Sequence, residues 1–171
     1  MVKILKMVPG DSTEISLDSF DRQQEINKVY VKEDGNYTLK EQPGIMDWSL
    51  EKKKEVAVDL ADSTYISYLA VADNQIIGFV SLVKELRESR MILDVIQVDR
   101  RYRGQGIGRA LWDVAYKEAK FYGAEAIYIS ACPAEETIGF YKAMGAEITD
   151  TPILSIAEEE PDDIQLVCKV K

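Results

Sequence analysis

The sequence contains no histidine among its 171 residues. Without histidine there is no Ser-His-Asp triad, no Cys-His catalytic pair and no histidine-bound zinc. Enzymes that depend on those arrangements are therefore excluded. Cysteine is also scarce, because only Cys132 and Cys168 are present and they form no Cys-x-x-Cys motif. We interpret both as free buried thiols of a reducing compartment.

Long apolar runs are missing as well. No run reaches the ~20 residues of a membrane-spanning helix, and the first residues, MVKILKMVPGD, are too short and too mixed for a signal peptide. We therefore expect a cytoplasmic protein without a membrane partner. The net charge of −9 argues against nucleic acid as a partner, because phosphate binding requires a basic face. It favours a cationic small molecule or a basic peptide, although acidic charge also serves solubility.

The order of predicted elements indicates a mixed α/β fold in one domain. Helices are predicted over 17–28, over 46–63 with Ser49 as N-cap, over 106–122 and over 133–146. Strands are predicted over 2–8, 29–31, 89–99, 124–131 and 164–170, with hairpin turns at 33–36 and 73–74. A βαβ unit near 91–131 forms the centre.

The stretch VDRRYRGQGIGRALWD, residues 98–113, combines positive charge with a glycine run in an acidic chain. Its glycines follow a strand and begin a helix, so several backbone N–H groups meet there with little side-chain bulk. These groups and the helix dipole favour an anion such as phosphate or pyrophosphate. The stretch also supplies guanidinium groups from Arg100, Arg101, Arg103 and Arg109.

Three phosphate-binding patterns can be compared with this stretch. A dinucleotide-binding loop needs G-x-G-x-x-G, but Arg109 occupies the third position and no acidic residue ends the next strand. A Walker A loop needs Gly-Lys-Ser/Thr, which is absent. The residues RGQGIG, 103–108, fit the coenzyme A pattern R/Q-x-x-G-x-G/A. The alternative is a turn that only begins a helix. Three glycines would then lower helix stability without serving any binding function.

The chain resembles the GCN5-related N-acetyltransferase (GNAT) family. The resemblance is carried by VDRRYRGQGIGRAL (98–111) and by SACPAEETIGFYKAMGAE (130–147), which is similar to a family segment ending in F-Y-x-x-x-G. With the neighbouring strands these blocks cover about 91–147. The tail EEEPDDIQLVCKV (158–170) is similar to the end of a poorly characterised bacterial-type branch that has no firm substrate.

The resemblance implies a single-domain fold over residues 1–171. Its central mixed sheet would be mostly antiparallel, with a splayed pair of parallel strands, and helices would flank it. The acceptor side would lie in about 1–62, the acetyl-CoA-binding core in about 63–147 and the last strands in about 147–171. Homodimers are common in this family, so a homodimer is a candidate assembly.

The resemblance also implies a direct transfer of acetyl from acetyl-CoA to an amine, in a ternary complex without an acyl-enzyme or a metal. The pyrophosphate would lie on the backbone amides of 104–109, and the pantetheine arm would run beside 96–98. The expected co-substrate-binding residues are Ile96, Gln97, Val98, Arg103, Gly104, Gln105, Gly106, Ile107, Gly108 and Arg109. Ala134 stands where the family often has an asparagine that touches the coenzyme, so that contact is lost or replaced.

Two residues are candidates for proton transfer. Tyr141 matches the family's tyrosine acid, a neutral donor at working pH; a core aromatic is the alternative, although Phe140 can fill that role. Asp94 is the candidate base, because a carboxylate in an apolar central strand is costly unless paired or used. A paired structural carboxylate and a chain of waters are its alternatives. In a regular strand Asp94 shares a face with Ile96, whereas the bulge usual in the family changes that face.

Signals for the acceptor are sparse. Trp48 and the tyrosines at 30, 37, 65 and 68 line a pocket or belong to the core, and EEEPDD (158–163) attracts an ammonium or is a solvated loop. Cys132 borders the pantetheine or is a buried bystander. The leading hypothesis is acetylation of a small cationic amine, such as an antibiotic-type cation or a polyamine. Acetylation of a protein N-terminus or lysine, and a non-catalytic acyl-CoA-binding module, are the alternatives.

Overall fold

Nearly continuous apolar runs in the central segments produce a seven-stranded sheet covered on both faces in this computed structural model, which describes residues 1–9 and 15–171. The strands are β1 (Lys3–Lys6), β2 (Gln24–Glu33), β3 (Asn36–Met46), β4 (Tyr65–Ala72), β5 (Gln75–Val83), β6 (Arg90–Val98), β7 (Ala126–Ala131), β8 (Glu147–Ile148) and β9 (Ile164–Lys169). The helices are α1 (Leu50–Ala61), α2 (Ile107–Phe121), α3 (Glu135–Ala143) and α4 (Leu154–Glu159), and a 3-10 turn covers Arg100–Tyr102. The sheet order is β1-β4-β5-β6-β7-β9-β8, while β2 and β3 pair separately.

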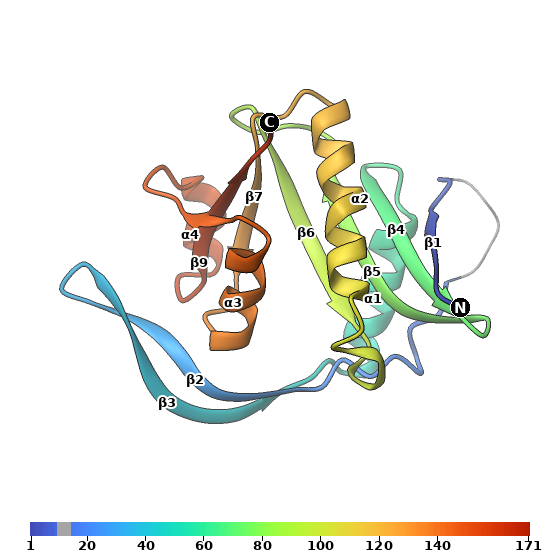
Figure 1. Ribbon diagram of the computed structural model, residues 1–171, viewed down its shortest axis with the longest axis horizontal. Coiled ribbons are helices and arrows are strands. Elements are labelled where there is room, and N and C mark those ends of the chain that lie inside the picture. The colour runs from blue at the N-terminus through green and yellow to red at the C-terminus, as the bar shows by residue number, and fades with distance from the viewer. Residues whose placement is uncertain (10–14) are drawn as a thin grey trace.

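Helices α1 and α2 cover opposite faces of the sheet (Figure 1). The apolar stripe of α2, which includes Leu111 and Ala115, packs in the larger buried cluster. The stripe of α1, with Val56 and Leu60, packs with Phe79 of β5 in a second cluster. Ser49 begins α1 as predicted, because its hydroxyl accepts a hydrogen bond from the Lys52 amide at 3.1 Å.

The predicted fold class is confirmed. The sheet is antiparallel except at β6 and β7, which are joined by the crossover helix α2. The parallel pairing spans only Arg90–Ile92 of β6 against Ala126–Tyr128 of β7. The two strands then diverge, and this splay opens the sheet at its centre (Figure 1).

The helix predicted over 17–28 does not form. Residues 17–23 are irregular, and the chain enters β2 at Gln24. Leu17 and Phe20 are buried against α1, whereas Ile26 and Val29 pack with Ala134. A register shift between β2 and β3 puts Ile26 and Val29 on one side of the strand, so their spacing of three resembles a helical spacing. The helix prediction was therefore wrong, because the strand irregularity produces the same spacing of buried residues.

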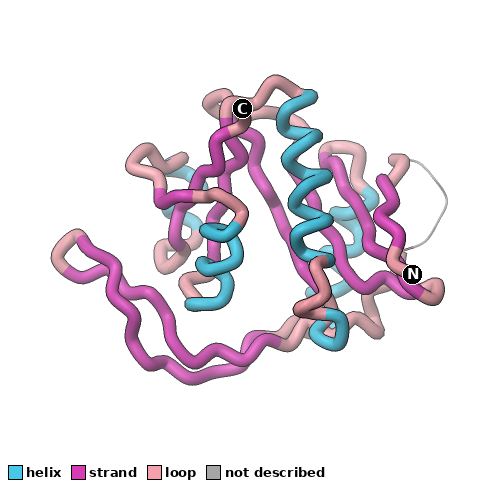
Figure 2. The backbone as a smooth tube through the Cα atoms, in the orientation of Figure 1, coloured by secondary structure: helices cyan, strands magenta, loops and turns pink. Residues whose placement is uncertain are grey.

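Strands β2 and β3 form a long curved arm that passes beneath α3 (Figure 2). The arm is attached there by the Tyr30 amide, which donates to the Pro133 carbonyl at 2.8 Å. Its turn at Asp34 and Gly35 confirms the predicted hairpin, as do Asp73 and Asn74 between β4 and β5. Helix α4 and strand β8 were not predicted. No helix in the described parts of the chain is long and apolar enough to cross a membrane.

Candidate active site

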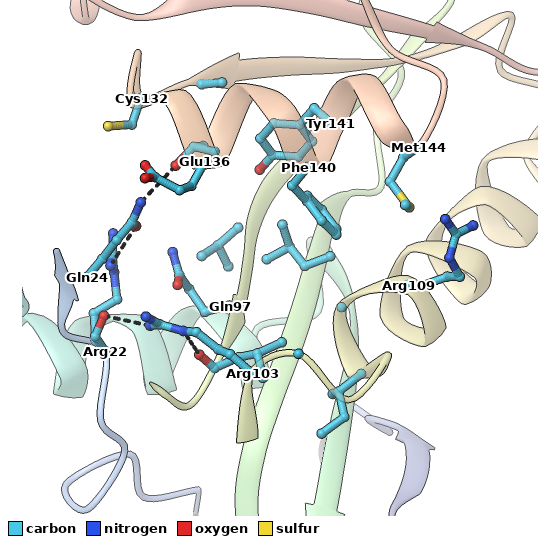
Figure 3. A pocket seen from close by; sticks show the side chains of 18 of the residues that line it. Arg22, Gln24, Gln97, Arg103, Arg109, Cys132, Glu136, Phe140, Tyr141 and Met144 are labelled. Carbon is cyan, nitrogen blue, oxygen red and sulfur yellow. Dashed lines mark hydrogen bonds between the residues drawn. The ribbon is translucent and has the colours of Figure 1, made fainter. Parts of the chain in front are cut away.

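A pocket of about 660 Å³ lies where β6 and β7 separate. Its walls come from the end of β6, the glycine loop before α2, the end of β7, helix α3 and the segment that leads into β2. Figure 3 shows Arg109 and Met144 toward one end, and Arg22, Gln24 and Glu136 toward the other. A volume of this size suits a small ligand.

The glycine loop has the backbone geometry that an anion site needs. Gly104 and Gly106 adopt left-handed φ angles of +79° and +83°, which favour glycine. A Cβ at either position would meet no atom within 4 Å, so the space beside the backbone is open. Gly106 is the N-cap of α2 without a side-chain cap hydrogen bond. Because glycine has no side chain that could cap the helix, the first amides of α2 are available to a ligand.

Gly108 serves close packing. A Cβ there would lie 3.2 Å from Cε2 of Phe140 on α3. Without a side chain at residue 108 the Phe140 ring packs closely against the start of α2, where a Cβ would force that ring to shift. This contact brings the glycine loop next to Tyr141.

Three of the four arginines of the glycine stretch are engaged within the protein. Arg103 donates to the backbone carbonyls of Val98 at 2.9 Å, Gln23 at 2.7 Å and Arg22 at 3.0 Å. These bonds fasten the segment before β2 to the end of β6.

Arg100 and Arg101 have similar local partners. Arg100 pairs with Asp21 at 3.1 Å and Arg101 with Asp99 at 2.7 Å. Arg109 lines the pocket and makes no hydrogen bond or ion pair within the described residues. Arg109 is therefore the arginine of this stretch whose side chain is open to a bound anion.

Tyr141 is 7% exposed and is held between other aromatic rings. Its ring centroid lies 6.2 Å from that of Trp112 and 5.4 Å from that of Phe140. The phenol makes no hydrogen bond to a described residue and lines the pocket, as Figure 3 shows. Burial raises the pKa of Tyr141, and the charge of Cys132 adds to this effect. The hydroxyl therefore stays protonated at neutral pH.

Asp94 is the extra residue of a β-bulge. Val95 pairs with Ser81 and Leu93 pairs with Leu82, so no residue of β5 stands opposite Asp94. Leu93 packs in the α2-side cluster, whereas Val95 packs in the α1-side cluster. The regular strand, in which Asp94 would share a face with Ile96, is therefore not what forms.

The electrostatic neighbours of Asp94 lie on α1. Burial raises the pKa of the Asp94 carboxyl and the charge of Asp59 raises it further, whereas Lys52 opposes the shift. The side chain still has exposed surface, because it opens into the pocket. Asp94 is therefore an ionisable side chain of the pocket wall, set apart from its neighbours by the bulge.

The pocket gathers most of the residues that the sequence singled out. Its lining includes Asp94, Ile96, Gln97, Val98, Arg103, Gly104, Gly106, Ile107, Gly108, Arg109, Cys132 and Tyr141. Gln105 is not part of the lining. Cys132 and Cys168 are free thiols, but only Cys168 is buried as predicted, whereas Cys132 is partly exposed and lies 3.4 Å from the sulfur of Met46.

Several expected acceptor residues lie elsewhere. Trp48 stacks on Phe79 at 6.2 Å, and Tyr68 donates to Glu118 at 2.6 Å, so both have structural contacts outside the pocket lining. Within EEEPDD, Asp163 accepts a hydrogen bond from Ser130, a lining residue, at 3.0 Å. Sequence reasoning missed Arg22, Gln24 and Glu136, because nothing in their local pattern distinguishes them from other polar residues.

Within the described residues no cluster of three or more His, Cys, Asp or Glu side chains could hold a metal ion. The parts of the site described above are a glycine loop, the buried phenol of Tyr141, the carboxyl of Asp94 in a bulge and the splayed edge of β6.

Solved structures share the fold: a candidate streptothricin acetyltransferase from Bacillus anthracis in complex with acetyl coenzyme A has 20% identity and a TM-score of 0.77, covering 100% of this chain and 99% of that chain. Nourseothricin acetyltransferase has 19% identity and a TM-score of 0.73, covering 99% of each chain. An aminoglycoside 6'-N-acetyltransferase complexed with coenzyme A has 17% identity and a TM-score of 0.57, covering 70% of this chain and 80% of that chain.

A search of curated proteins found no match. The sequence profile of the acetyltransferase (GNAT) family matches residues 24–146, which is more than half of the chain and includes the first predicted motif block and all but the last residue of the second. The predicted family and enzyme class are thereby confirmed: this chain belongs to the acetyltransferase (GNAT) family.

Proposed function

We propose that this acetyltransferase moves the acetyl group of acetyl-CoA directly to the primary amine of a small cationic acceptor, within a ternary complex. One observation carries the proposal: a single pocket is lined by the glycine loop, the free edge of β6, Tyr141 and Asp94. The similar Bacillus anthracis structure contains acetyl coenzyme A, which supports the choice of donor.

The donor would bind along the loop and the splayed strand. Uncapped amides from Gly104 to Arg109, with the Arg109 guanidinium, suit the diphosphate. Beyond Ile92 the edge of β6 that faces β7 is unpaired. The pantetheine arm can hydrogen-bond to that edge at Ile96 and Gln97 as an added strand would.

Carboxylates in the pocket support a cationic acceptor, although the lining carries as many arginines (Arg22, Arg103 and Arg109). Glu25, Asp94 and Glu136 line it, and none of them forms an ion pair with a described residue. The volume of about 660 Å³ must also hold part of the donor, so the remaining space suits a small molecule. These features favour a small amine over a protein substrate, which needs an open groove.

The chemistry requires a base and an acid. An alkylammonium with a pKa near ~10.4 must lose a proton before it attacks, and Asp94 accepts that proton directly or through water. The nitrogen then attacks the thioester carbonyl, and backbone N–H groups of β6 stabilise the oxyanion. When the C–S bond breaks, Tyr141 donates its proton to the departing thiolate, and the resulting phenolate recovers the second proton that the nitrogen loses as the amide forms. The products are the amide and CoA with its free thiol.

The test measures thiol release from acetyl-CoA with panels of polyamines, aminoglycosides and short peptides. Turnover of small amines with sequential kinetics is expected, since both substrates must be bound before transfer. Turnover of peptides alone would support a protein acetyltransferase instead. Binding of CoA without thiol release on any amine would make the protein a binding module. The free thiols of Cys132 and Cys168 are consistent with a cytoplasmic location for this reaction.

A further inference from the structure

Arg22 is a buried charge that lacks a carboxylate partner. It is 5% exposed, lies just before β2 and lines the pocket. Its Nε is buried without a hydrogen-bond partner, and Nη1 donates to Gln24 Oε1 at 3.3 Å. No carboxylate of the described residues forms an ion pair with it. Burial lowers the pKa of Arg22, and the neighbouring Arg103 lowers it further.

An arginine in this state is unusual. A guanidinium has five N–H donors, and burying a charge is costly unless it is paired and hydrogen-bonded. Within the described residues the side chain of Arg22 has one long hydrogen bond and a cation–π contact with Trp48, 5.4 Å from the ring centroid. A ligand oxygen would supply the partner that the protein does not.

The position of Arg22 is fixed before any ligand arrives. Its backbone carbonyl accepts a bond from Arg103 at 3.0 Å. Gln24, which accepts from its side chain, in turn donates to Thr137 of α3 at 3.1 Å. The Arg22 backbone is therefore held by Arg103 from the loop after β6, and its guanidinium is linked through Gln24 to α3, as a preorganised binding group should be.

Arg22 lies next to Arg103, at the end of the pocket away from Arg109 and the start of α2. Trp48, over which it stacks, packs in the α1-side cluster, whereas the loop begins α2 on the other face of the sheet. In Figure 3, Arg109 stands at one end of the pocket and Arg22 and Glu136 at the other. If the diphosphate lies near Arg109, as the proposed function holds, the Arg22 end receives the acceptor.

We propose that Arg22 binds a carboxylate or amide-carbonyl oxygen of the acceptor. The acceptor is then a small amine that also carries such an oxygen, for example an amino acid or an amino-acid amide, and not a plain alkyl polyamine. Glu136 at the same end of the pocket attracts the ammonium group of that molecule. This inference rests on the proposed function and narrows its substrate class.

The experiment compares matched amines that differ only in the oxygen group. Three sets serve: lysine, lysine amide and 1,5-diaminopentane; β-alanine, β-alanine amide and ethylamine; glycine, glycine amide and methylamine. In at least one set the oxygen-bearing amines should exceed the plain amine in kcat/KM by about 10- to 100-fold, which is the effect of one charged hydrogen bond. A preference for the acid over the amide, or the reverse, identifies which oxygen Arg22 binds.

The variant Arg22→Met should abolish this preference while the KM for acetyl-CoA stays unchanged. Arg22→Lys keeps the charge but loses the planar fork, so it should restore only part of the preference. Arg100→Met is the matched control, because Arg100 belongs to the same network yet lies outside the pocket lining. A role limited to folding would lower activity toward all amines equally and would lower Tm.

Binding gives a readout that does not depend on turnover. Calorimetry with CoA present should show at least 10-fold weaker binding of the preferred oxygen-bearing amine to Arg22→Met than to wild type. Equal use of the plain amine in every set, or unchanged binding in the variant, would overturn the inference. A preference of wild type for succinyl-CoA over acetyl-CoA that Arg22→Met loses would assign Arg22 to the acyl group instead. Failure of the proposed function looks different, because no amine would then release thiol even though CoA binds.

Discussion

The glycine loop provides the sharpest test of the donor site. Gly106→Ala adds one methyl group at a backbone position with φ of +83°, where no atom lies within 4 Å. The methyl group therefore clashes with nothing in the free protein. It projects into the open space beside the amides that are proposed to bind the diphosphate, so its effect should appear mainly in ligand binding.

The expected magnitudes follow from two separate effects. The left-handed conformation costs an L-residue about 1–2 kcal/mol, and the reduced entropy of the unfolded chain returns about 0.4–1 kcal/mol. The net loss in the free energy of unfolding is about 1 kcal/mol, or a Tm lower by about 2–4 °C for a chain of this size. Disturbing a hydrogen bond to a charged group costs about 1.5–3 kcal/mol, which weakens CoA binding by about 10- to 100-fold.

Gly35→Ala separates these effects. Gly35 has φ of +81° and also no atom within 4 Å, but it lies in the turn of the β2–β3 arm, outside the pocket lining. Both variants should lose similar stability in thermal unfolding, while calorimetry should detect weaker CoA binding only for Gly106→Ala. Equal CoA affinity in the two variants would refute the reasoning that the loop amides hold the diphosphate.

Four other variants test side chains of the same pocket. Tyr141→Phe should lower kcat by ~10²-fold without changing Tm, because the hydroxyl has no hydrogen bond to lose; an unchanged kcat removes the phenol from catalysis. Asp94→Asn should remove the acidic limb of the kcat/KM profile, which should lie above the usual carboxylate range. Since its folded pKa is raised, wild type should lose stability relative to this variant as pH rises through that pKa; parallel pH–stability curves would contradict this. Arg103→Met should lower the free energy of unfolding by about 2–4 kcal/mol, whereas Arg109→Met should spare stability and weaken CoA binding, and reversed effects would contradict both assignments.

The sequence predicted the parts of the site that depend on local backbone chemistry. A strand, a glycine turn and an amphipathic helix follow one another in 90–121. Each is recognised from several neighbouring residues, so no single residue decides the prediction. The phenol of Tyr141 could likewise be found because its motif is local. These two segments supply much of the pocket lining.

The remaining parts depend on contacts between distant residues. Arg103 and Arg109 look alike in sequence, but Arg103 is bound to carbonyls about 80 residues away and Arg109 is not. Arg22 lies in a segment where buried residues at a spacing of three were interpreted as a helix. No local pattern could identify which cation would be left without a partner, because that depends on where the arm crosses the sheet.

The two irregularities of β6 explain how one strand can serve both substrates. On the side of β5 the bulge at Asp94 turns a carboxyl toward the α1 face, and on the side of β7 the loss of pairing after Ile92 frees backbone groups. Unpaired backbone groups in a sheet must be satisfied by a ligand or water, so the splay is most stable when an extended molecule occupies it. The donor would then approach from the α2 side and the amine from the α1 side. We propose direct transfer across the strand, in which the amine and the thioester would meet without a covalent intermediate on the protein.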